Sequence, residues 1–281
     1  MEQLEGRVAV VTGGAGGIGL GMVRAFAGAG MRVVIADVRK DAIDAAVAEL
    51  TGRGHEAIGV PTDVSKLSEV EALAAAALDA FGRVNVLCNN AGVGTFSPIS
   101  RTSIDDWEWM LGIDLWGPIY GVKTFLPLIE REDQGHINST ASIAGLVAGG
   151  AAGPYNVAKH GIVALMTTLE RELRAAKSSV RTSVLCPGAV NTGIGRNSVD
   201  SRRAHQGKEP ARASVEGDKL SAKVSAALAG GMDPDDVGRL VLDAILTDTF
   251  WVFTDARLLR HVQEQVATMV DDRALSRLRL F

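Results

Sequence analysis

The sequence predicts an α/β fold, a doubly wound and mostly parallel Rossmann-like sheet of about seven strands with helices on both faces. Short apolar runs alternate with longer amphipathic segments through the first two-thirds of the 281 residues. A glycine-rich loop, Thr12–Gly19, follows the first apolar run and opens the first helical segment. Aromatic residues make up only 5% of the chain, and the excess of aliphatic residues is typical of a sheet buried on both faces.

Each expected strand is a short apolar run that ends at a turn residue or a polar residue. The strands are expected at Arg7–Val11, Arg32–Ala36, His55–Val60, Val84–Cys88, Gly135–Thr140, Val180–Cys186 and Phe250–Thr254. The expected helices carry apolar residues at helical spacing. They are expected at Gly17–Ala29, Lys40–Leu50, Leu67–Phe81, Ser103–Glu130 and Pro154–Ala176. A last helix starts at Asp233-Pro234 and runs to about Leu246, because aspartate is a good N-cap and proline fits the first turn.

The chain is expected to form one domain over residues 1–281, because an open α/β sheet reaches this size without splitting. Residues 193–231 depart in composition, since basic residues lie there among glycine, serine and proline. We expect this segment, with the helical-looking Lys219–Leu228, to be a lid over the substrate, and a disordered loop is the alternative. Residues 256–281 are expected to form a C-terminal helical tail. Its amphipathic part, Arg257–Leu278, closes the substrate pocket or contacts a second subunit.

Composition argues against several classes of partner. Hydrophobic residues make up 47% and charged residues 22% of the chain, which lies inside the globular range. A net charge of -4 gives no electrostatic reason to bind nucleic acid or an anionic membrane. The first residues carry no basic and apolar leader pattern, and no apolar stretch approaches the length of a membrane span. We therefore expect a soluble, cytoplasmic protein.

The cysteines and histidines give no sign of a metal site. Cys88 and Cys186 each end an apolar strand-like run, so we expect reduced thiols in the core, with a metal or redox role as the alternative. The histidines show no spacing typical of metal ligands; they are His55, His136, His160, His205 and His261. No metal is expected.

The residues that carry chemistry all follow predicted strands. In doubly wound sheets, ligands bind beyond the carboxyl ends of the strands, near the point where the strand order reverses. The segments expected at that edge are the glycine loop, Asp37, Asp63-Val64, Asn89-Asn90-Ala91-Gly92, Ser142 and Pro187-Gly188. These independent placements agree on one site.

The glycine loop and Asp37 predict a dinucleotide site and indicate which dinucleotide. Glycines let the backbone approach a ligand closely, and the N-terminus of the helix that follows favours phosphate. Asp37 ends the next strand, where a carboxylate can accept hydrogen bonds from both hydroxyls of the adenosine ribose. The same carboxylate repels a 2′-phosphate. NAD is therefore favoured over NADP, with Arg39 as the only neighbouring residue that argues for NADP. The alternatives are a tight turn without a ligand and an ordinary carboxylate at the strand end.

Tyr155 and Lys159 predict a proton-transfer site, because side chains four residues apart share one face of a helix. A phenol has a pKa near 10, so a phenol that acts as a base near neutrality needs a shift of about three units, roughly 4 kcal/mol. A lysine charge about 4 Å away supplies about that much at an effective dielectric near 20. Lys159 could also hold the nicotinamide ribose. Ser142, on the turn after the fifth strand, could bind the substrate oxygen and stabilise developing alkoxide charge. Taken alone, each pattern is more often coincidental.

Together these residues resemble, in order and spacing, the short-chain dehydrogenase/reductase family over about residues 5–255. The resemblance implies that Asp63 and Val64 hold the adenine and that Val190 and Thr192 contact the carboxamide. It also implies homodimers or homotetramers built on the two long helices around 111–128 and 155–174. The full set expected to bind the cofactor is Gly13, Ala15, Gly17, Ile18, Gly19, Asp37, Val38, Asp63, Val64, Asn90, Ala91, Gly92, Tyr155, Lys159, Pro187, Gly188, Val190 and Thr192.

Asp114 departs from the family pattern. Members usually carry asparagine here, where it helps hold a water that links the lysine to solvent. Aspartate keeps the shape and loses the amide donors. A carboxylate near Lys159 would offset part of the charge that acidifies Tyr155, so Asp114 is a catalytic candidate, and Asp114→Asn should lower the apparent pKa of the forward rate. In the alternative, only the backbone of Asp114 serves the water.

These features predict an NAD-dependent oxidoreductase that interconverts a secondary alcohol and its ketone. Tyr155 would exchange the hydroxyl proton, Ser142 would fix the oxygen, and the hydride would pass to nicotinamide C4. A mainly apolar pocket favours a medium-sized hydrophobic or cyclic alcohol over a sugar. Its candidate residues are Val93, Gly94, Phe96, Ile143, Ala144, Leu146, Val147, Gly149, Gly150 and Ile194. The alternatives are a substrate carboxylate held by basic lid residues, an NADPH-dependent ketone reductase, and a non-catalytic dinucleotide sensor on the same fold.

Overall fold

The structure is a computed structural model that describes residues 1, 3–207, 226 and 228–272. Its centre is a seven-stranded sheet with the order β3-β2-β1-β4-β5-β6-β7. All neighbouring strands are parallel. The strands are β1 (Val8–Thr12), β2 (Arg32–Asp37), β3 (Ala57–Pro61), β4 (Val86–Asn89), β5 (Gly135–Thr140), β6 (Val180–Cys186) and β7 (Trp251–Phe253). The predicted doubly wound fold is confirmed, and the strand order reverses between β1 and β4.

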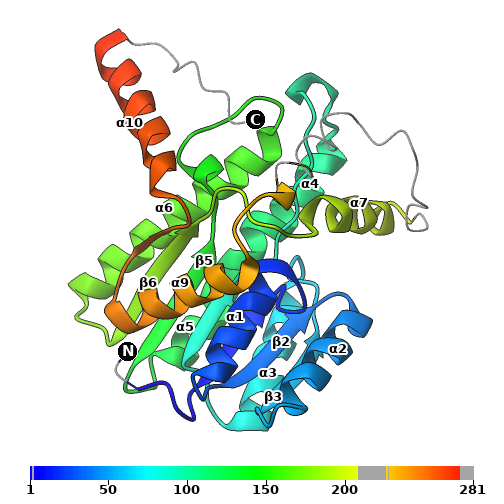
Figure 1. Cartoon of the computed structure of the whole chain (residues 1–281), viewed down its shortest axis with the longest axis vertical. Coiled ribbons are helices and arrows are strands. Elements are labelled where there is room, and N and C mark those ends of the chain that lie inside the picture. Colours follow the sequence, from blue (N-terminus) through cyan, green and yellow to red (C-terminus); the bar gives the residue numbers. More distant parts are fainter. Residues whose placement is uncertain (2, 208–225, 227, 273–281) are drawn as a thin grey trace.

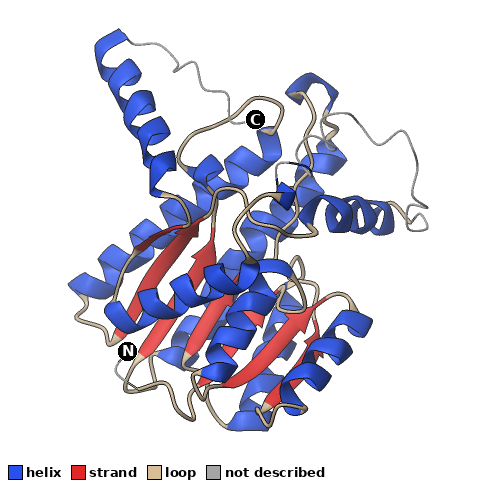
Figure 2. Cartoon of the chain, in the orientation of Figure 1, coloured by secondary structure: helices blue, strands red, loops and turns tan. Residues whose placement is uncertain are grey.

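Helices cover both faces of the sheet (Figures 1 and 2). Alternate residues of each strand point to opposite faces, so each face has its own apolar cluster. One cluster joins the sheet to α1 (Gly17–Gly28), α2 (Lys40–Thr51) and α9 (Pro234–Thr247). The other joins it to α3 (Leu67–Phe81), α5 (Gly117–Ile129) and α6 (Gly153–Ala175).

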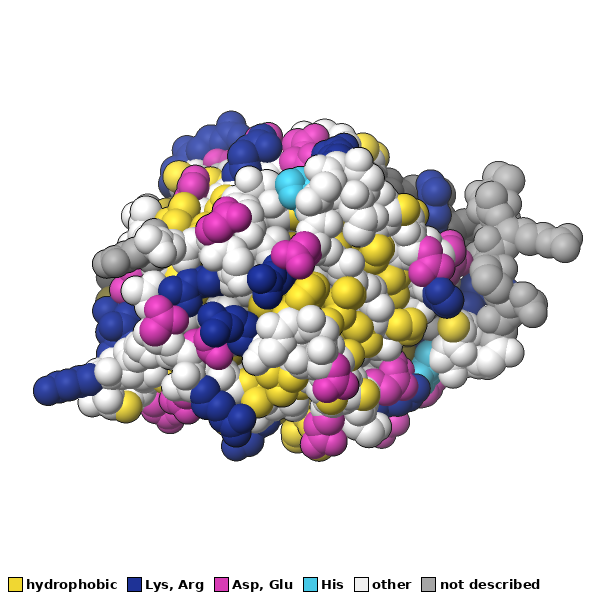
Figure 3. Space-filling view, turned by 90° about the horizontal axis from the view of Figure 1, so that it is seen from below, with side chains coloured by type: hydrophobic (Ala, Val, Ile, Leu, Met, Phe, Trp, Pro, Cys, Tyr) yellow, Lys and Arg dark blue, Asp and Glu magenta, His cyan; other side chains and the backbone are white. Residues whose placement is uncertain are grey.

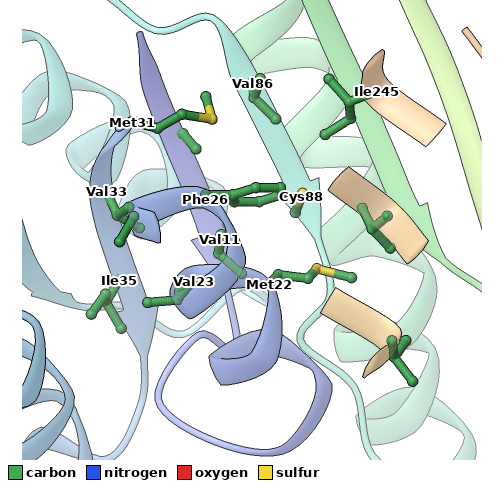
Figure 4. Close-up of a cluster of buried hydrophobic side chains, with 14 of the residues drawn as sticks. Val11, Met22, Val23, Phe26, Met31, Val33, Ile35, Val86, Cys88 and Ile245 are labelled. Carbon is green, nitrogen blue, oxygen red and sulfur yellow. The ribbon is translucent and has the colours of Figure 1, made fainter. Parts of the chain in front are cut away.

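The first cluster contains Cys88 and the second contains Cys186, so each face of the sheet holds one core cysteine. Phe26 and Met22 of α1 pack over Val11 and Cys88 of the sheet (Figure 4). Both Cys88 and Cys186 are free and buried, as predicted. Burial raises the pKa of the Cys88 thiol, and it raises the pKa of Cys186 to about 12. Both thiols are therefore protonated near neutrality and act as small apolar side chains.

The prediction of a single helix over Ser103–Glu130 is wrong, because the structure divides this segment into two α-helices with a π-helical turn between them. Ser103 caps α4 (Ile104–Leu111), a π-helical turn follows at Gly112–Trp116, and α5 begins at Gly117. A π turn holds one more residue than an α turn and often marks a functional site. Apolar spacing cannot reveal one extra residue inside a long amphipathic segment. The turn carries Asp114 into the interior.

The segments after β6 are described in part. α7 (Ile194–His205) opens the predicted lid, and most of the helical-looking Lys219–Leu228 lies outside the described residues. In the tail, a 3-10 turn at Ala256–Leu258 leads into α10 (Leu259–Ala267), which has no buried residue and stands away from the sheet (Figure 1). A π turn at Thr268–Asp272 follows. Within the described ranges, no helix is both long and apolar enough to span a bilayer.

The amino ends of the strands form a face with charges of both signs (Figure 3). Arg7 pairs there with Asp133 at 2.8 Å, and Arg32 pairs with Glu56 at 3.0 Å. Such exposed pairs add little to stability. The chemistry-bearing residues lie at the opposite edge.

Candidate active site

One cavity of about 1360 Å³ opens at the carboxyl edge of the sheet, where the sequence motifs were expected. Its volume exceeds the roughly 300–1,000 Å³ of an ordinary ligand site, so it can hold two molecules side by side. Nearly all the predicted cofactor residues lie on its wall: Gly13, Gly17, Ile18, Asp37, Val38, Asp63, Val64, Asn90, Ala91, Gly92, Tyr155, Lys159, Pro187, Gly188, Val190 and Thr192. Ser142 lies on the same wall.

Three predicted site residues lie off this wall. Ala15 packs in the core cluster under α1. Gly19 faces the loop itself, because a Cβ there would lie 2.1 Å from the Gly13 carbonyl oxygen. Asp114 is completely buried behind Lys159. Gly19 thus lets the loop fold tightly, and Asp114 can act only through another residue.

The glycine loop brings the N-terminus of α1 to the cavity wall. Gly13 has φ +61°, and a Cβ added there would lie 2.8 Å from Ala91 Cα. The loop is therefore in close contact with the turn that follows β4. Gly16 precedes α1 without any side chain that caps the helix. The first N–H groups of α1 therefore need acceptors from a ligand or solvent. An anionic phosphate fits these donors.

The end of the cavity beside β2 and β3 carries the acidic side chains Asp37 and Asp63 and the basic side chain Arg39. The Asp37 carboxylate is buried and lies 3.2 Å from Arg39 Nε. Arg39 also reaches over Gly16, because a Cβ added at Gly16 would lie 3.0 Å from Arg39 Nη2. Burial tends to raise the pKa of Asp63, but hydrogen bonds from Ser65 and the charge of Lys66 lower it overall. Both aspartates are thus held as hydrogen-bond acceptors.

Helix α6 brings Tyr155 and Lys159 to the same part of the cavity. Lys159 Nζ lies 5.4 Å from the centre of the Tyr155 ring and donates a hydrogen bond to the Thr140 carbonyl at 3.2 Å. Lys159 is 4% exposed, so its charge acts across a medium of low dielectric. Ser142 follows β5, and its Oγ accepts the Ala144 N–H at 3.1 Å. That bond leaves the Ser142 hydroxyl hydrogen available to a ligand.

Asp114 forms a buried ion pair with Lys159. Its Oδ2 lies 3.0 Å from Lys159 Nζ, and its Oδ1 accepts the Val93 N–H at 2.8 Å. Burial raises the pKa of the Asp114 carboxyl, and the Lys159 charge only partly offsets this. Burial alone would lower the pKa of Lys159, but the negative charge of Asp114 raises it overall. Lys159 therefore stays protonated.

The substrate side of the cavity is mainly apolar. Most predicted pocket residues lie on it, whereas Leu146 and Val147 face the interior instead. The Phe96 and Tyr155 rings pack 6.3 Å apart at 49°. Leu228 and Leu258 on this wall come from the segments predicted as lid and tail. Residues that the sequence did not indicate also contribute, among them Trp109, Ile113, Ala152 and Asn156. Of these, only Asn156 had a local signal, because it directly follows Tyr155.

Two further expectations can be placed only in part. In the described part of the chain, no group of three or more histidine, cysteine, aspartate or glutamate side chains is arranged so that it could hold a metal ion. Of the basic lid residues, Arg202 pairs with Asp105 and Asp106. Lys208 and Arg212 lie outside the described residues.

The switch point, the glycine loop and the strand-end aspartate define a Rossmann-like α/β protein of the dinucleotide-binding class. Within that class, the chain belongs to the short-chain dehydrogenase family, because the model of that family, described as short chain dehydrogenase, matches residues 7–203. The resemblance seen in the sequence is confirmed, and the chain is an oxidoreductase of this family.

Comparisons with individual proteins agree. The C alpha-dehydrogenase of a Sphingobium strain is 31% identical over 274 residues, which cover 96% of this chain and 88% of that protein. The 1-deoxy-11-beta-hydroxypentalenate dehydrogenase of Streptomyces exfoliatus is 35% identical, over 91% of this chain and 86% of that protein. A short chain dehydrogenase/reductase from Burkholderia phymatum, solved in complex with NAD, superposes with a TM-score of 0.91 at 35% identity and covers 99% of both chains.

Proposed function

We propose that this protein interconverts a medium-sized, mainly hydrophobic secondary alcohol and its ketone with NAD. The observation that carries the proposal is the buried Lys159 beside Tyr155 on the wall of a cavity that also contains the glycine loop and Asp37. Bound NAD would supply the hydride acceptor. The protein supplies the binding of both molecules, their orientation and the proton transfer.

The residues that would hold NAD follow from the cavity wall. The uncapped N-terminus of α1 supports pyrophosphate binding, and the buried Asp37 supports binding of the adenosine ribose. The family resemblance supports adenine contacts from Asp63 and Val64 and carboxamide contacts from Val190 and Thr192, and all four residues lie on the cavity wall. The structural neighbour from Burkholderia phymatum, which was solved with NAD, supports the choice of dinucleotide.

In the proposed oxidation, Tyr155 accepts the hydroxyl proton and Ser142 donates a hydrogen bond to the substrate oxygen. Lys159 favours the deprotonated phenol through its nearby charge. The apolar substrate side favours hydrophobic or cyclic alcohols over sugars. An NADPH-dependent ketone reductase is the second candidate, because Arg39 lies where it could pair with a 2′-phosphate. The intact Ser142, Tyr155 and Lys159 argue against a non-catalytic sensor.

Cofactor choice gives the first test. We expect kcat/KM for NAD to exceed that for NADP at least tenfold, about 1.4 kcal/mol, because the Asp37 charge repels a 2′-phosphate. Asp37→Asn should narrow this ratio roughly tenfold or more, since Arg39 then loses its carboxylate partner. Steady-state NADH and NADPH formation by both proteins checks this. Asp44→Asn, which removes an exposed carboxylate of α2, is the control. A wild-type preference for NADP would instead support the reductase.

Asp114 gives a test of the electrostatics around Lys159. Asp114→Asn should leave the fold intact and lower the apparent pKa of the kcat/KM profile for oxidation by roughly one unit. The sign follows because the uncompensated Lys159 charge then favours the basic form of Tyr155 more strongly. Initial rates between neutral and alkaline pH measure the shift. Asp79→Asn, which removes an exposed carboxylate of α3, is the control. If the pH profile of Asp114→Asn is unchanged, as that of the control should be, Asp114 has no part in the mechanism.

The protein's association and location are also proposals. Trp116 and Val157 are 50% and 49% exposed on the helical face formed by the π turn and α6. A second subunit that packed on this face would remove these apolar side chains from water. Their exposure therefore supports a homodimer or homotetramer built on these helices. A substrate lid within residues 193–231, a contribution of the tail 256–281 to the pocket and a cytoplasmic location complete the proposal.

A further inference from the structure

Helix α7 crosses the substrate side of the cavity although its sequence provides almost no apolar anchor. Its residues on the cavity wall include Asn197, Ser201, Ala204 and His205. Its only two buried residues, Ser198 and Arg202, are polar. Apolar burial, which docks most surface helices, contributes little here. The position of α7 must therefore depend on specific polar contacts.

Ser198 and Arg202 supply these contacts from one face of α7, because they are four residues apart. Ser198 is fully buried, and its Oγ accepts the Gly94 N–H at 2.8 Å and donates to the Ile194 carbonyl at 2.6 Å. Arg202 is only 9% exposed, and its guanidinium carbon lies 5.6 Å from the centre of the Trp109 ring. The first contact ties α7 to the turn after β4, and the second ties it to α4.

The partners of Arg202 are two carboxylates in the first turn of α4. Arg202 Nη2 donates to Asp105 at 2.5 Å, and Arg202 Nε donates to Asp106 at 2.6 Å. Asp106 is itself fixed, because its other oxygen accepts the Ser103 N–H at 3.0 Å in a capping box. His205 Nε2 lies 3.0 Å from the second oxygen of Asp105. The guanidinium, which is itself little exposed, therefore bridges two helices through charge-assisted hydrogen bonds to one half-buried carboxylate and one exposed carboxylate.

We propose that Arg202 is a positioning residue that locks α7 onto α4 and so fixes the size limit of the substrate cavity. The inference rests on the proposed function for its kinetic consequence and on the contacts alone for its structural one. With the lock intact, the α7 side chains on the wall hold one position and exclude bulkier alcohols. Without it, α7 keeps the contacts of Ser198 and the contact between His205 and Asp105, but it loses its buried tie to α4 and the wall yields.

The variants Arg202→Met, Asp105→Asn and their combination test the lock in the full-length protein. Methionine keeps much of the bulk of Arg202 and removes its charge. We expect hydrogen exchange of residues 194–205 in the substrate-free protein to accelerate roughly tenfold or more in Arg202→Met. Asp105→Asn should show a smaller change in the same direction. The double variant should exceed Arg202→Met only by the effect of the weakened contact between His205 and Asp105, since the contact between Arg202 and Asp105 is already lost in Arg202→Met. Arg196→Met removes an exposed charge from the same helix and is the control.

The kinetic readout compares a compact and a bulky alcohol of one series. In Arg202→Met, KM for the compact alcohol should rise roughly tenfold with kcat within about twofold, because substrate binding is weakened and the proton-transfer residues are untouched. The preference for the compact alcohol over the bulky one should shrink. If hydrogen exchange of α7 is the same in Arg202→Met as in the wild type, the lock is wrong, and this result does not depend on which substrate the enzyme oxidises. Faster exchange with an unchanged compact-to-bulky ratio would overturn the size limit. If no alcohol is oxidised, the proposed function fails while the exchange result still decides the lock.

Discussion

Replacing Tyr155 with phenylalanine is expected to lower kcat for alcohol oxidation by roughly 10²–10⁴-fold, the range that general acid–base catalysis supplies. The substitution removes only the phenolic oxygen, so the ring keeps its packing against Phe96. NAD binding, measured by calorimetry or fluorescence, should change by less than about threefold, because the contacts proposed for the dinucleotide are mainly those of the glycine loop and Asp37. Steady-state NADH formation measures the loss of turnover.

The chain offers a matched control, since it contains two tyrosines. Tyr120 lies on α5 and packs against Trp116 with ring centres 5.6 Å apart, away from the cavity wall. Tyr120→Phe should therefore retain near wild-type turnover. Equal activity in Tyr155→Phe and Tyr120→Phe would sink the assignment of Tyr155 and bring back a dinucleotide-binding protein without catalysis.

Replacing Lys159 with methionine is expected to abolish turnover and also to destabilise the protein by about 3–5 kcal/mol, because a buried ion pair loses one partner. Asp114 is fully buried, and its only remaining described donor is the Val93 N–H. Burial raises the pKa of Asp114, so the folded variant binds a proton more readily than the unfolded chain. The stability deficit should therefore grow as the pH rises from the ordinary carboxyl range through the raised pKa, and shrink toward acid.

The double variant Asp114→Asn/Lys159→Met separates the two roles of Lys159. Removal of both charges should recover most of the lost stability in urea unfolding, because no unpaired charge stays in the interior. Turnover should stay lost, since no ammonium group faces Tyr155. If Lys159→Met unfolds at the wild-type urea concentration, the ion pair contributes no stability. If the double variant regains turnover, the lysine is not part of the chemistry.

Local patterns were sufficient to predict much of the fold and the site. Alternating apolar runs located all seven strands within about two residues, since parallel strands of this kind are buried on both faces. Asp37 and Ser142 could be placed because each follows a strand, and strand ends meet at one edge. Tyr155 and Lys159 could be paired because four-residue spacing on a helix puts both side chains on one face.

Features that depend on distant contacts could not be predicted in this way. The π turn at Gly112–Trp116 adds a residue within a continuous amphipathic pattern, and it brings Asp114 against Lys159 from another helix. Trp109 reaches the cavity only because α4 packs beside the turn after β4. The Arg202 lock joins residues about a hundred positions apart. The basic composition of the lid indicated a solvated loop face, with a substrate carboxylate as the alternative, and gave no sign of an internal ion pair.

The central claim is that the Tyr155 phenol, which lies beside the Lys159 ammonium group, meets the carbinol of a substrate next to a bound nicotinamide. A crystal structure of the protein with NAD and an unreactive ketone or alcohol analogue tests this most directly. We expect the nicotinamide near Lys159, with the analogue's oxygen in hydrogen-bond contact with both Tyr155 and Ser142. A nicotinamide bound elsewhere, or an analogue oxygen out of reach of Tyr155, would contradict the account.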